Sequence, residues 1–137
     1  MRGKGDIIIG IDAGTSVVKA VAFDLSGRQL ESAAVRNTYE TGEHGAATQS
    51  LSQTWEDCVS ALRGLSEKVP GLSARTAAIS VTGQGDGTWL VGRDNKPVGD
   101  AWIWLDARAA NTVTKLAAGP MNRCLLYTSP SPRDRTR

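Results

Sequence analysis

The sequence predicts an α/β domain in which a mixed sheet is built in the order β-β-β-α-β. Three observations predict it: an isoleucine-rich run near the amino terminus, two alternating segments that follow it through short turns, and a helical repeat of apolar residues before a fourth apolar segment. With 137 residues, 40% apolar and 22% charged, the chain can bury one modest core. We therefore expect a single domain.

The first three strands are predicted as a meander. A β-branched run over residues 7–11 is typical of a strand covered on both faces. Asp12 follows at its end, Gly14 permits a tight turn, and side chains alternate over residues 17–23. We therefore expect a second strand antiparallel to the first, and a third over residues 28–37 after the DLSG turn.

A loop, a helix and a fourth strand follow. Residues 38–50 are polar and contain glycine, so we expect a loop there, in which His44 has no partner at metal-ligand or catalytic spacing. Apolar residues then recur at helical spacing after Ser52, which can cap the helix. Glycine and proline within residues 64–71 mark its end, and residues 77–81 read as a strand parallel to the first.

The turn after the first strand carries groups suited to phosphate. The Asp12 carboxylate can hold Mg²⁺ through water, while backbone amides near Gly14, the hydroxyls of Thr15 and Ser16, and the Lys19 ammonium can hold phosphate oxygens. Such a set suits phosphoryl transfer. The alternative is an ordinary hairpin turn, because Asp and Gly are favoured in turns for backbone reasons alone.

Two later segments carry groups suited to a sugar or polyol. In VTGQGDGTWL, residues 81–90, Gln84 and Asp86 follow an apolar strand at the sheet edge where ligands bind in open α/β sheets. The alternative is a glycine-rich turn with a solvated Asp. In AWIWLDARAA, residues 101–110, the Trp104 indole can pack on C–H groups while Asp106 accepts bonds from hydroxyls.

The second of these segments also has a structural interpretation. Trp102 and Trp104 can be core residues, and Asp106 can cap a helix running over residues 107–118. Arg108 can pair with Asp106 or with Asp100. Asp106 is able to fill both the structural and the ligand-binding role.

Together these segments resemble the FGGY carbohydrate kinases, which belong to the actin, hexokinase and Hsp70 ATPase superfamily. GIDAGTSVVKAVAFD resembles the family pattern GIDxGTTSxKAxxxD, departing at Ser16 and Val17, and Trp104, Asp106 and Arg108 match its Trp-x-Asp-x-Arg motif. The resemblance implies a truncated RNase H-like (actin/hexokinase-type ATPase) fold. It also implies a site for ATP and Mg²⁺, with Asp12 as the metal-binding residue, and a substrate site: Asp12, Gly14, Thr15, Ser16 and Lys19 for the cofactor; Gln84, Asp86, Trp104 and Asp106 for the substrate.

The resemblance narrows the substrate. The string Gly83-Gln84-Gly85-Asp86 fits neither the Asn-Gln-Arg-Glu of glycerol kinases nor the Gly-Gln-Met-His of xylulokinases, and residues 83–110 resemble erythritol kinases most. The implied reaction transfers the γ-phosphoryl group of ATP to a terminal hydroxyl of a short polyol or ketose, with erythritol favoured. Xylulose and a keto-sugar acid are the alternative substrates.

The resemblance covers about a quarter of a typical family chain, so residues 1–123 are expected to be a partial amino-terminal kinase domain. The family's general-base Asp and adenosine-binding domain are expected downstream, so no catalytic residue is assigned here and the 137-residue chain should be inactive. Full-length members of the family are often dimeric. The alternative is a complete, non-catalytic nucleotide-binding module or a defunct remnant.

The positive charge is confined to the carboxyl-terminal tail. Residues 1–123 hold 13 basic and 13 acidic residues, whereas residues 124–137 add three Arg and one Asp to reach the net charge of +2. This tail, CLLYTSPSPRDRTR, is expected to be disordered and resembles translated adapter or vector read-through. The alternative is a basic arm that contacts phosphate backbones.

Partners and location follow from the same composition. No apolar run is long enough for a membrane span or has the form of a secretory signal, and Cys58 and Cys124 fit neither a disulfide framework nor a zinc site. We expect a cytoplasmic protein with reduced thiols that binds a small molecule and neither nucleic acid nor membrane.

Overall fold

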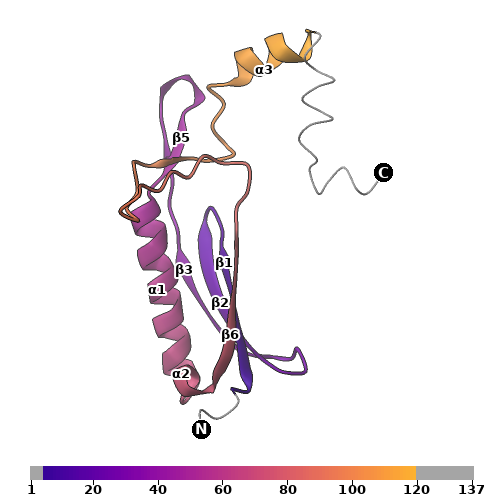
Figure 1. Ribbon diagram of the computed structural model, residues 1–137, viewed down its shortest axis with the longest axis vertical. Helices are drawn as coiled ribbons and strands as arrows, with labels where there is room; N and C mark the ends of the chain where they lie inside the picture. The colour runs from indigo at the N-terminus through magenta and orange to yellow at the C-terminus, as the bar shows by residue number, and fades with distance from the viewer. Residues whose placement is uncertain (1–4, 120–137) are drawn as a thin grey trace.

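The computed structural model describes residues 5–119, and it contains the predicted β-β-β-α-β order (Figure 1). A four-stranded sheet has the order β3-β2-β1-β6, in which β1 pairs antiparallel with β2 and parallel with β6, and β2 pairs antiparallel with β3. The elements of this part are β1 (Ile7–Ala13), β2 (Val17–Asp24), β3 (Gln29–Arg36), α1 (Leu51–Lys68), α2 (Leu72–Arg75) and β6 (Thr76–Gly83).

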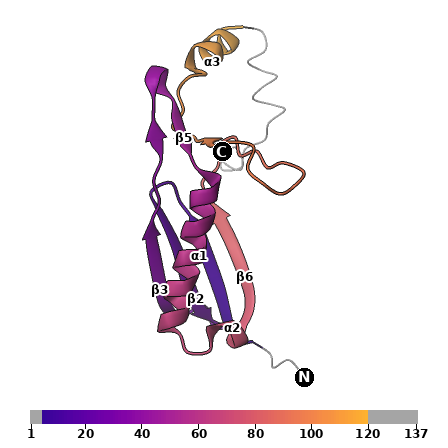
Figure 2. The same cartoon turned by 90° about the vertical axis from the view of Figure 1, so that its left-hand side faces the viewer.

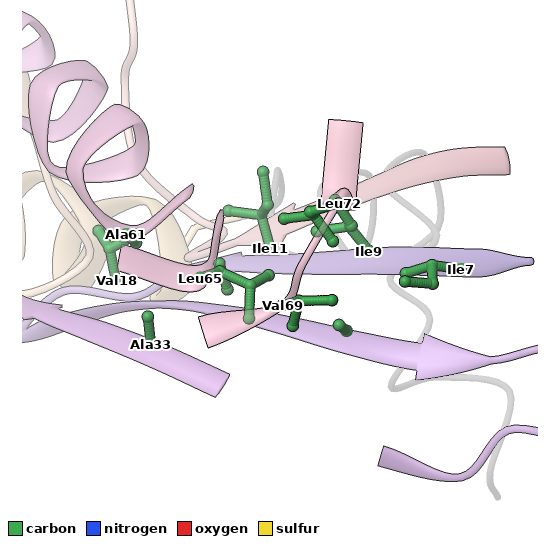
Figure 3. Close-up of a cluster of buried hydrophobic side chains, with 11 residues drawn as sticks. Ile7, Ile9, Ile11, Val18, Ala33, Ala61, Leu65, Val69 and Leu72 are labelled. Atoms are coloured by element: carbon green, nitrogen blue, oxygen red, sulfur yellow. The ribbon is translucent and has the colours of Figure 1, made fainter. Parts of the chain in front are cut away.

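The core lies between α1 and one face of the sheet (Figures 2 and 3). Alternate residues of β1 and β2 point to this face, as the period of two predicts for a strand. The buried set is Ile7, Ile9, Ile11, Val18, Ala20, Ala22, Ala33, Ala61, Leu65, Val69 and Leu72. The small side chains on β2 and β3 allow α1 to approach closely, so Leu65 is fully buried and contributes about 1.5–3 kcal/mol by the transfer scale.

The prediction that the first strand is covered on both faces is wrong for the described residues. Ile8 points away from α1 and is 37% exposed, because no described element packs on that face. β6 is also uncovered: Ile79 and Val81 are 55% and 66% exposed although they lie on the α1 side of the sheet, in register with Ile9 and Ile11. The helix packs against β2 and β3 and leaves the β6 edge open (Figure 2).

The loop predicted over residues 38–50 is a second small sheet. It contains β4 (Glu40–Thr41), the 3₁₀ turn η1 (Glu43–Gly45) and β5 (Ala47–Gln49), and β5 pairs with β7 (Ala101–Trp102) in the order β4-β5-β7. The strand partner is more than fifty residues away in sequence, so the local pattern of polar residues and glycine could not indicate it.

The helix boundaries also differ from the prediction. α1 is capped by Ser50, whose hydroxyl accepts a bond of 3.3 Å from the Gln53 N–H, and not by Ser52. The helix continues through Gly64 to Lys68. A Cβ atom at Gly64 would lie 3.4 Å from the Cβ of Ala33, so glycine at this position lets the helix lie close to the sheet. The helix predicted over residues 107–118 is shorter, as α3 (Ala110–Ala117).

The predicted tail of residues 124–137 lies outside the described residues. Within residues 5–119, no helix has the length and apolar character needed to cross a membrane.

Candidate functional site

The predicted phosphate residues lie at the turn between β1 and β2. Asp12 belongs to β1, which extends to Ala13, and lies opposite Lys19 in the antiparallel register. Both side chains are exposed on the sheet face away from α1, since their neighbours Ile11 and Val18 point into the core. They line a hollow of about 280 Å³ whose other walls come from Gly10, Ile11, Val21, Phe23, Ser80 and Thr82.

Backbone bonds hold the turn in one shape. The Gly14 N–H donates to the Val17 carbonyl at 3.1 Å, and the Asn37 N–H donates to the Ser16 carbonyl at 2.9 Å. A Cβ atom at Gly14 would lie 2.8 Å from the Val17 oxygen, so the turn requires glycine at this position.

Two buried amide side chains bind the carbonyls of the turn. Asn37 Nδ2 donates to the Gly14 carbonyl at 3.0 Å, and Gln49 Nε2 donates to the Thr15 carbonyl at 2.9 Å. Asn37 and Gln49 are only 3% and 2% exposed. The N–H groups of Thr15 and Ser16 have no acceptor within residues 5–119, so they are available to an anion.

The structure gives Gln84 and Asp86 different environments. Gln84 is half-buried; its Nε2 donates to Gln49 Oε1, and its own Oε1 is buried without a hydrogen-bond partner in the described part of the chain. Asp86 is exposed and has φ of 59°, a left-handed conformation that Asp tolerates better than most residues. Gln84 therefore points inward with a free acceptor, whereas Asp86 faces solvent.

Trp104 contacts the turn between β1 and β2 directly. Its indole nitrogen donates to the Thr15 hydroxyl at 3.1 Å, and its side chain is still exposed. Trp102 is exposed as well, with the Arg108 guanidinium carbon 4.4 Å from its ring centroid, a cation–π contact. Neither tryptophan is a core residue of the described chain, so that alternative is wrong.

Asp106 joins the segment after β7 to β5. Its Oδ2 accepts bonds from the Ala47 N–H at 3.0 Å and from Arg108 Nη2 at 2.6 Å, and its Oδ1 accepts from the Arg108 N–H at 3.1 Å. The Arg108 guanidinium and the Ala47 N–H hold the pKa of Asp106 well below its usual range. The predicted pairing with Arg108 is confirmed. The predicted helix cap is wrong, because the N-cap of α3 is Ala109.

A second hollow, of about 480 Å³, opens between α1 and β6. Its walls are mainly apolar and include Trp55, Cys58, Val81 and Trp89, with Gln84 at one side. Burial, together with the Asp57 carboxylate, raises the pKa of the Cys58 thiol, which disfavours the nucleophilic thiolate.

Sequence reasoning missed Asn37 and Gln49. Both are polar residues at buried positions, and Gln49 belongs to a three-residue strand that could not be recognised locally. Alternation of Ala47 and Gln49 to one side was the available signal, but it covers too few residues to indicate a strand.

Comparison with known proteins identifies the relatives of this arrangement. Residues 7–129 match the N-terminal domain of the FGGY family of carbohydrate kinases. The chain is 82% identical over 123 residues to the erythritol kinase of Brucella abortus (strain 2308). The matched residues make up 90% of this chain and 24% of that protein. It is 33% identical over 106 residues to a Haemophilus influenzae protein named "Probable L-xylulose kinase", covering 77% of this chain and 22% of that protein.

Solved structures agree in fold. A crystal structure of a xyloylose kinase from Brucella ovis superposes with a TM-score of 0.78 at 24% sequence identity, covering 86% of this chain and 25% of that one. The chain thus spans about a quarter of the length of the curated relatives it matches.

Proposed function

Because the chain belongs to the FGGY family of carbohydrate kinases, we propose that it is the amino-terminal part of an ATP-dependent kinase that phosphorylates a terminal hydroxyl of a short polyol. Erythritol is the favoured substrate, since the Brucella abortus protein named erythritol kinase is 82% identical over the matched residues. Xylulose and a keto-sugar acid are the alternatives, supported by the more distant kinases of L-xylulose and 3-keto-L-gulonate.

One observation carries the proposal: the Trp104 indole nitrogen donates to the Thr15 hydroxyl at 3.1 Å. Phosphoryl transfer requires the nucleotide phosphate and the acceptor hydroxyl to be held next to each other. The contact brings the segment suited to a polyol against the turn suited to phosphate, although 89 residues separate them in sequence.

The turn fits ATP and Mg²⁺ by the chemistry of its groups. Asp12 is an exposed carboxylate beside a hollow, and residues 5–119 contain no cluster of three or more His, Cys, Asp or Glu that could hold a metal alone. Mg²⁺ is typically bound by one or two carboxylates together with substrate phosphates and water, so Asp12 suffices as its protein ligand. When bound, the ion would neutralise phosphate charge. The groups proposed to hold the phosphates are the N–H groups of the turn and the side chains of Thr15, Ser16 and Lys19, with Gly14 providing the close approach.

The proposed polyol site combines flat apolar surface with hydrogen-bond acceptors. Trp104 presents its exposed indole to C–H groups, and Gln84 Oε1, which is buried and lacks a partner among the described residues, is an acceptor for a hydroxyl once the side chains that cover it move aside. Asp86 is exposed and able to accept a second hydroxyl. Both carboxylate oxygens of Asp106 already accept bonds, so a substrate hydroxyl would share that carboxylate with Arg108 and Ala47.

The catalytic base is proposed to lie outside these 137 residues, as an Asp of the longer protein, and no described residue is assigned that role. The 137-residue chain alone should therefore be inactive. The partial domain of residues 1–123, the foreign origin of residues 124–137, a dimeric assembly and a cytoplasmic location remain predictions of the same proposal.

The test begins with the source DNA, sequenced through codon 123 on fresh template. If the frame continues, the longer protein is purified and assayed for ATP-dependent phosphorylation of erythritol, xylulose, glycerol and a keto-sugar acid. We expect turnover with erythritol to be the fastest, and Asp12→Asn to abolish it. Asp94→Asn is the matched control, because Asp94 is exposed and lines neither hollow.

Two results would contradict the proposal. A longer protein that phosphorylates none of the four compounds excludes the polyol kinase assignment. A frame that truly ends at residue 137, together with tight binding of Mg-ATP by the short chain, favours the nucleotide-binding module.

A further inference from the structure

Gln49 uses all the polar atoms of its side chain, although it is 2% exposed. Its Nε2 donates to the Thr15 and Thr38 carbonyls, both at 2.9 Å, and its Oε1 accepts from Gln84 Nε2. A buried amide with two donors and an acceptor engaged has one orientation, because every rotation leaves a buried polar group unpaired.

We propose that Gln49 is a positioning residue that fixes the phosphate-binding turn and, through Gln84, couples it to the polyol site. This inference rests on the proposed function for its catalytic consequence, whereas its structural part stands independently. Gln49 lies on β5, outside all three sequence segments suited to phosphate or polyol.

The first step concerns the turn. In a trans peptide the carbonyl of one residue and the N–H of the next point in opposite directions. Asn37 and Gln49 bind the carbonyls of Gly14 and Thr15 from the buried side, so the N–H groups of Thr15 and Ser16 point away from these amides. The two free donors are thereby held ready for phosphate oxygens before any ligand arrives, and such preorganisation strengthens anion binding.

The second step concerns Gln84. The Oε1 atom of Gln49 can only accept, so Gln84 must turn its Nε2 toward it, which directs the Gln84 Oε1 elsewhere. That oxygen is buried and has no partner in the described part of the chain. Gln49 therefore determines that the unpaired atom of Gln84 is an acceptor instead of a donor, which a polyol hydroxyl can satisfy once the side chains that cover it move aside.

The third step joins the two. One side chain binds the turn, the segment after β3 and the residue after β6, so a shift in any of the three breaks bonds in the others. Replacing Gln49 by Leu leaves the Thr15 and Thr38 carbonyls and the Gln84 amide without their partner. The loss of these hydrogen bonds should loosen both the turn between β1 and β2 and the side chain of Gln84.

The structural part is tested by amide hydrogen exchange, in the 137-residue chain and in the longer protein. Gln49→Leu is compared with Gln29→Leu, which alters an exposed glutamine at the start of β3. We expect the exchange of the Gly14 and Asn37 amides to accelerate about tenfold in Gln49→Leu, as for loss of one or two buried hydrogen bonds. Exchange at Leu65 in α1 should remain as in the wild type, and Gln29→Leu should change neither.

The functional part is tested by steady-state kinetics of the longer protein. We expect Gln49→Leu to lower kcat about tenfold and to raise KM for both ATP and the polyol, whereas Gln84→Leu should raise KM for the polyol more than KM for ATP. The double variant should lose less than the sum of the two, because the residues act through one bond. If Gln49→Leu does not fold, Gln49→Asn keeps a neutral amide on a side chain one methylene shorter, which cannot reach all three partners, so it should still raise KM for ATP.

The outcomes separate the two claims. Unchanged exchange at Gly14 and Asn37, or additive kinetic losses, would overturn the role of Gln49 even if the enzyme phosphorylates erythritol. Accelerated exchange in Gln49→Leu, together with a wild-type longer protein that has no kinase activity, would support the structural part and reject the proposed function.

Discussion

The indole nitrogen of Trp104 donates a hydrogen bond of 3.1 Å to the hydroxyl of Thr15. Thr15 belongs to the turn that joins β1 to β2, and Trp104 lies just after β7. The bond links the four-stranded sheet to the smaller sheet of β4, β5 and β7 at the point where phosphate and polyol are proposed to meet. Substitutions at Trp104 can separate the effect of losing this hydrogen bond from the effect of losing the indole ring.

Trp104→Phe retains the flat ring and removes the N–H donor, whereas Trp104→Ala removes both. In the longer protein we expect Trp104→Phe to lower kcat severalfold, in keeping with about 1 kcal/mol for one hydrogen bond. Trp104→Ala should in addition raise KM for the polyol. Steady-state kinetics check this, with Leu25→Ala as the control because Leu25 is exposed in the turn after β2 and lines neither hollow. Equal effects of Phe and Ala at position 104 would rule out a separate role for the N–H group.

Leu65→Ala should destabilise the domain by about 2–5 kcal/mol, because it leaves a cavity in the core between α1 and the sheet. Urea unfolding followed by circular dichroism measures the change. Glu67→Ala on the exposed face of the same helix should change stability by less than about 0.5 kcal/mol. A small loss for Leu65→Ala would mean that α1 does not pack on the sheet as described.

Asp106→Asn should weaken the acid dependence of stability. The pKa of Asp106 is lowered in the fold by Arg108 and the Ala47 N–H, from an ordinary value near 3.8. The contribution of Asp106 to the free energy of unfolding is thus fully present above the pKa of the unfolded state and is lost as the pH falls through the lower pKa of the folded state. Unfolding midpoints measured from about pH 5 down to about pH 2 should fall less steeply in Asp106→Asn than in the wild type.

Two further variants test the same explanation of the pH dependence. Arg108→Gln removes the cation beside Asp106, so the unfolding midpoint should again fall less steeply between about pH 5 and about pH 2 than in the wild type. The pKa of Asp24 is lowered to about 2, chiefly by hydrogen bonds from the Ser26 side chain and the Arg28 backbone N–H. Asp24→Asn should therefore also make the unfolding midpoint fall less steeply as the pH is lowered. Identical pH dependence of the unfolding midpoint in the wild type and Asp106→Asn would exclude the Asp106–Arg108 pair as a source of stability.

Gly14→Ala should distort the phosphate turn. The added Cβ would lie 2.8 Å from the Val17 carbonyl oxygen, so the backbone must shift, at a cost of about 1–3 kcal/mol. In the longer protein, binding of Mg-ATP measured by calorimetry should weaken at least severalfold. Gly85→Ala is the control, since a Cβ there meets no atom within 4 Å. Equal affinities for Mg-ATP in wild type and Gly14→Ala would exclude this turn as the phosphate site.

The 137-residue chain should expose apolar surface along β6. Ile79 and Val81 are more than half exposed, and they adjoin the apolar hollow that Trp55 also lines. Exposed sheet edges with apolar side chains promote association. We expect concentration-dependent light scattering and binding of the dye ANS, both reduced by Ile79→Thr combined with Val81→Thr. The pair Ala77→Thr and Ser80→Thr is the control, and a monomer that binds no dye would contradict the expectation.

Local patterns were sufficient to predict the main sheet and the turn between β1 and β2. The strand run of residues 7–11, the alternation after Val17 and the glycine at position 14 each depend on neighbours in sequence, so they predicted β1, β2 and their turn. The helical repeat predicted α1 for the same reason. The cap was misplaced by two residues because Ser50 and Ser52 are equally suited to it, and only the backbone decides between them.

The remaining features depend on contacts between distant residues. β5 is a strand because β7 pairs with it, and Gln49 is buried because the turn and Gln84 surround it. Asp106 cannot be distinguished from a helix cap until Ala47 and Arg108 are placed beside it.

By itself the sequence determined the β-β-β-α-β order of the main sheet, the position of the turn proposed to bind phosphate and the kinship with the FGGY carbohydrate kinases. Those features depend on short-range periodicity and on motifs a few residues long. Only the tertiary structure decided which sheet face stays open beside Asp12, which buried amides hold the turn, and that Trp104 touches Thr15. These depend on how a chain packs elements from far apart, and packing is set by all the contacts at once and not by any local pattern.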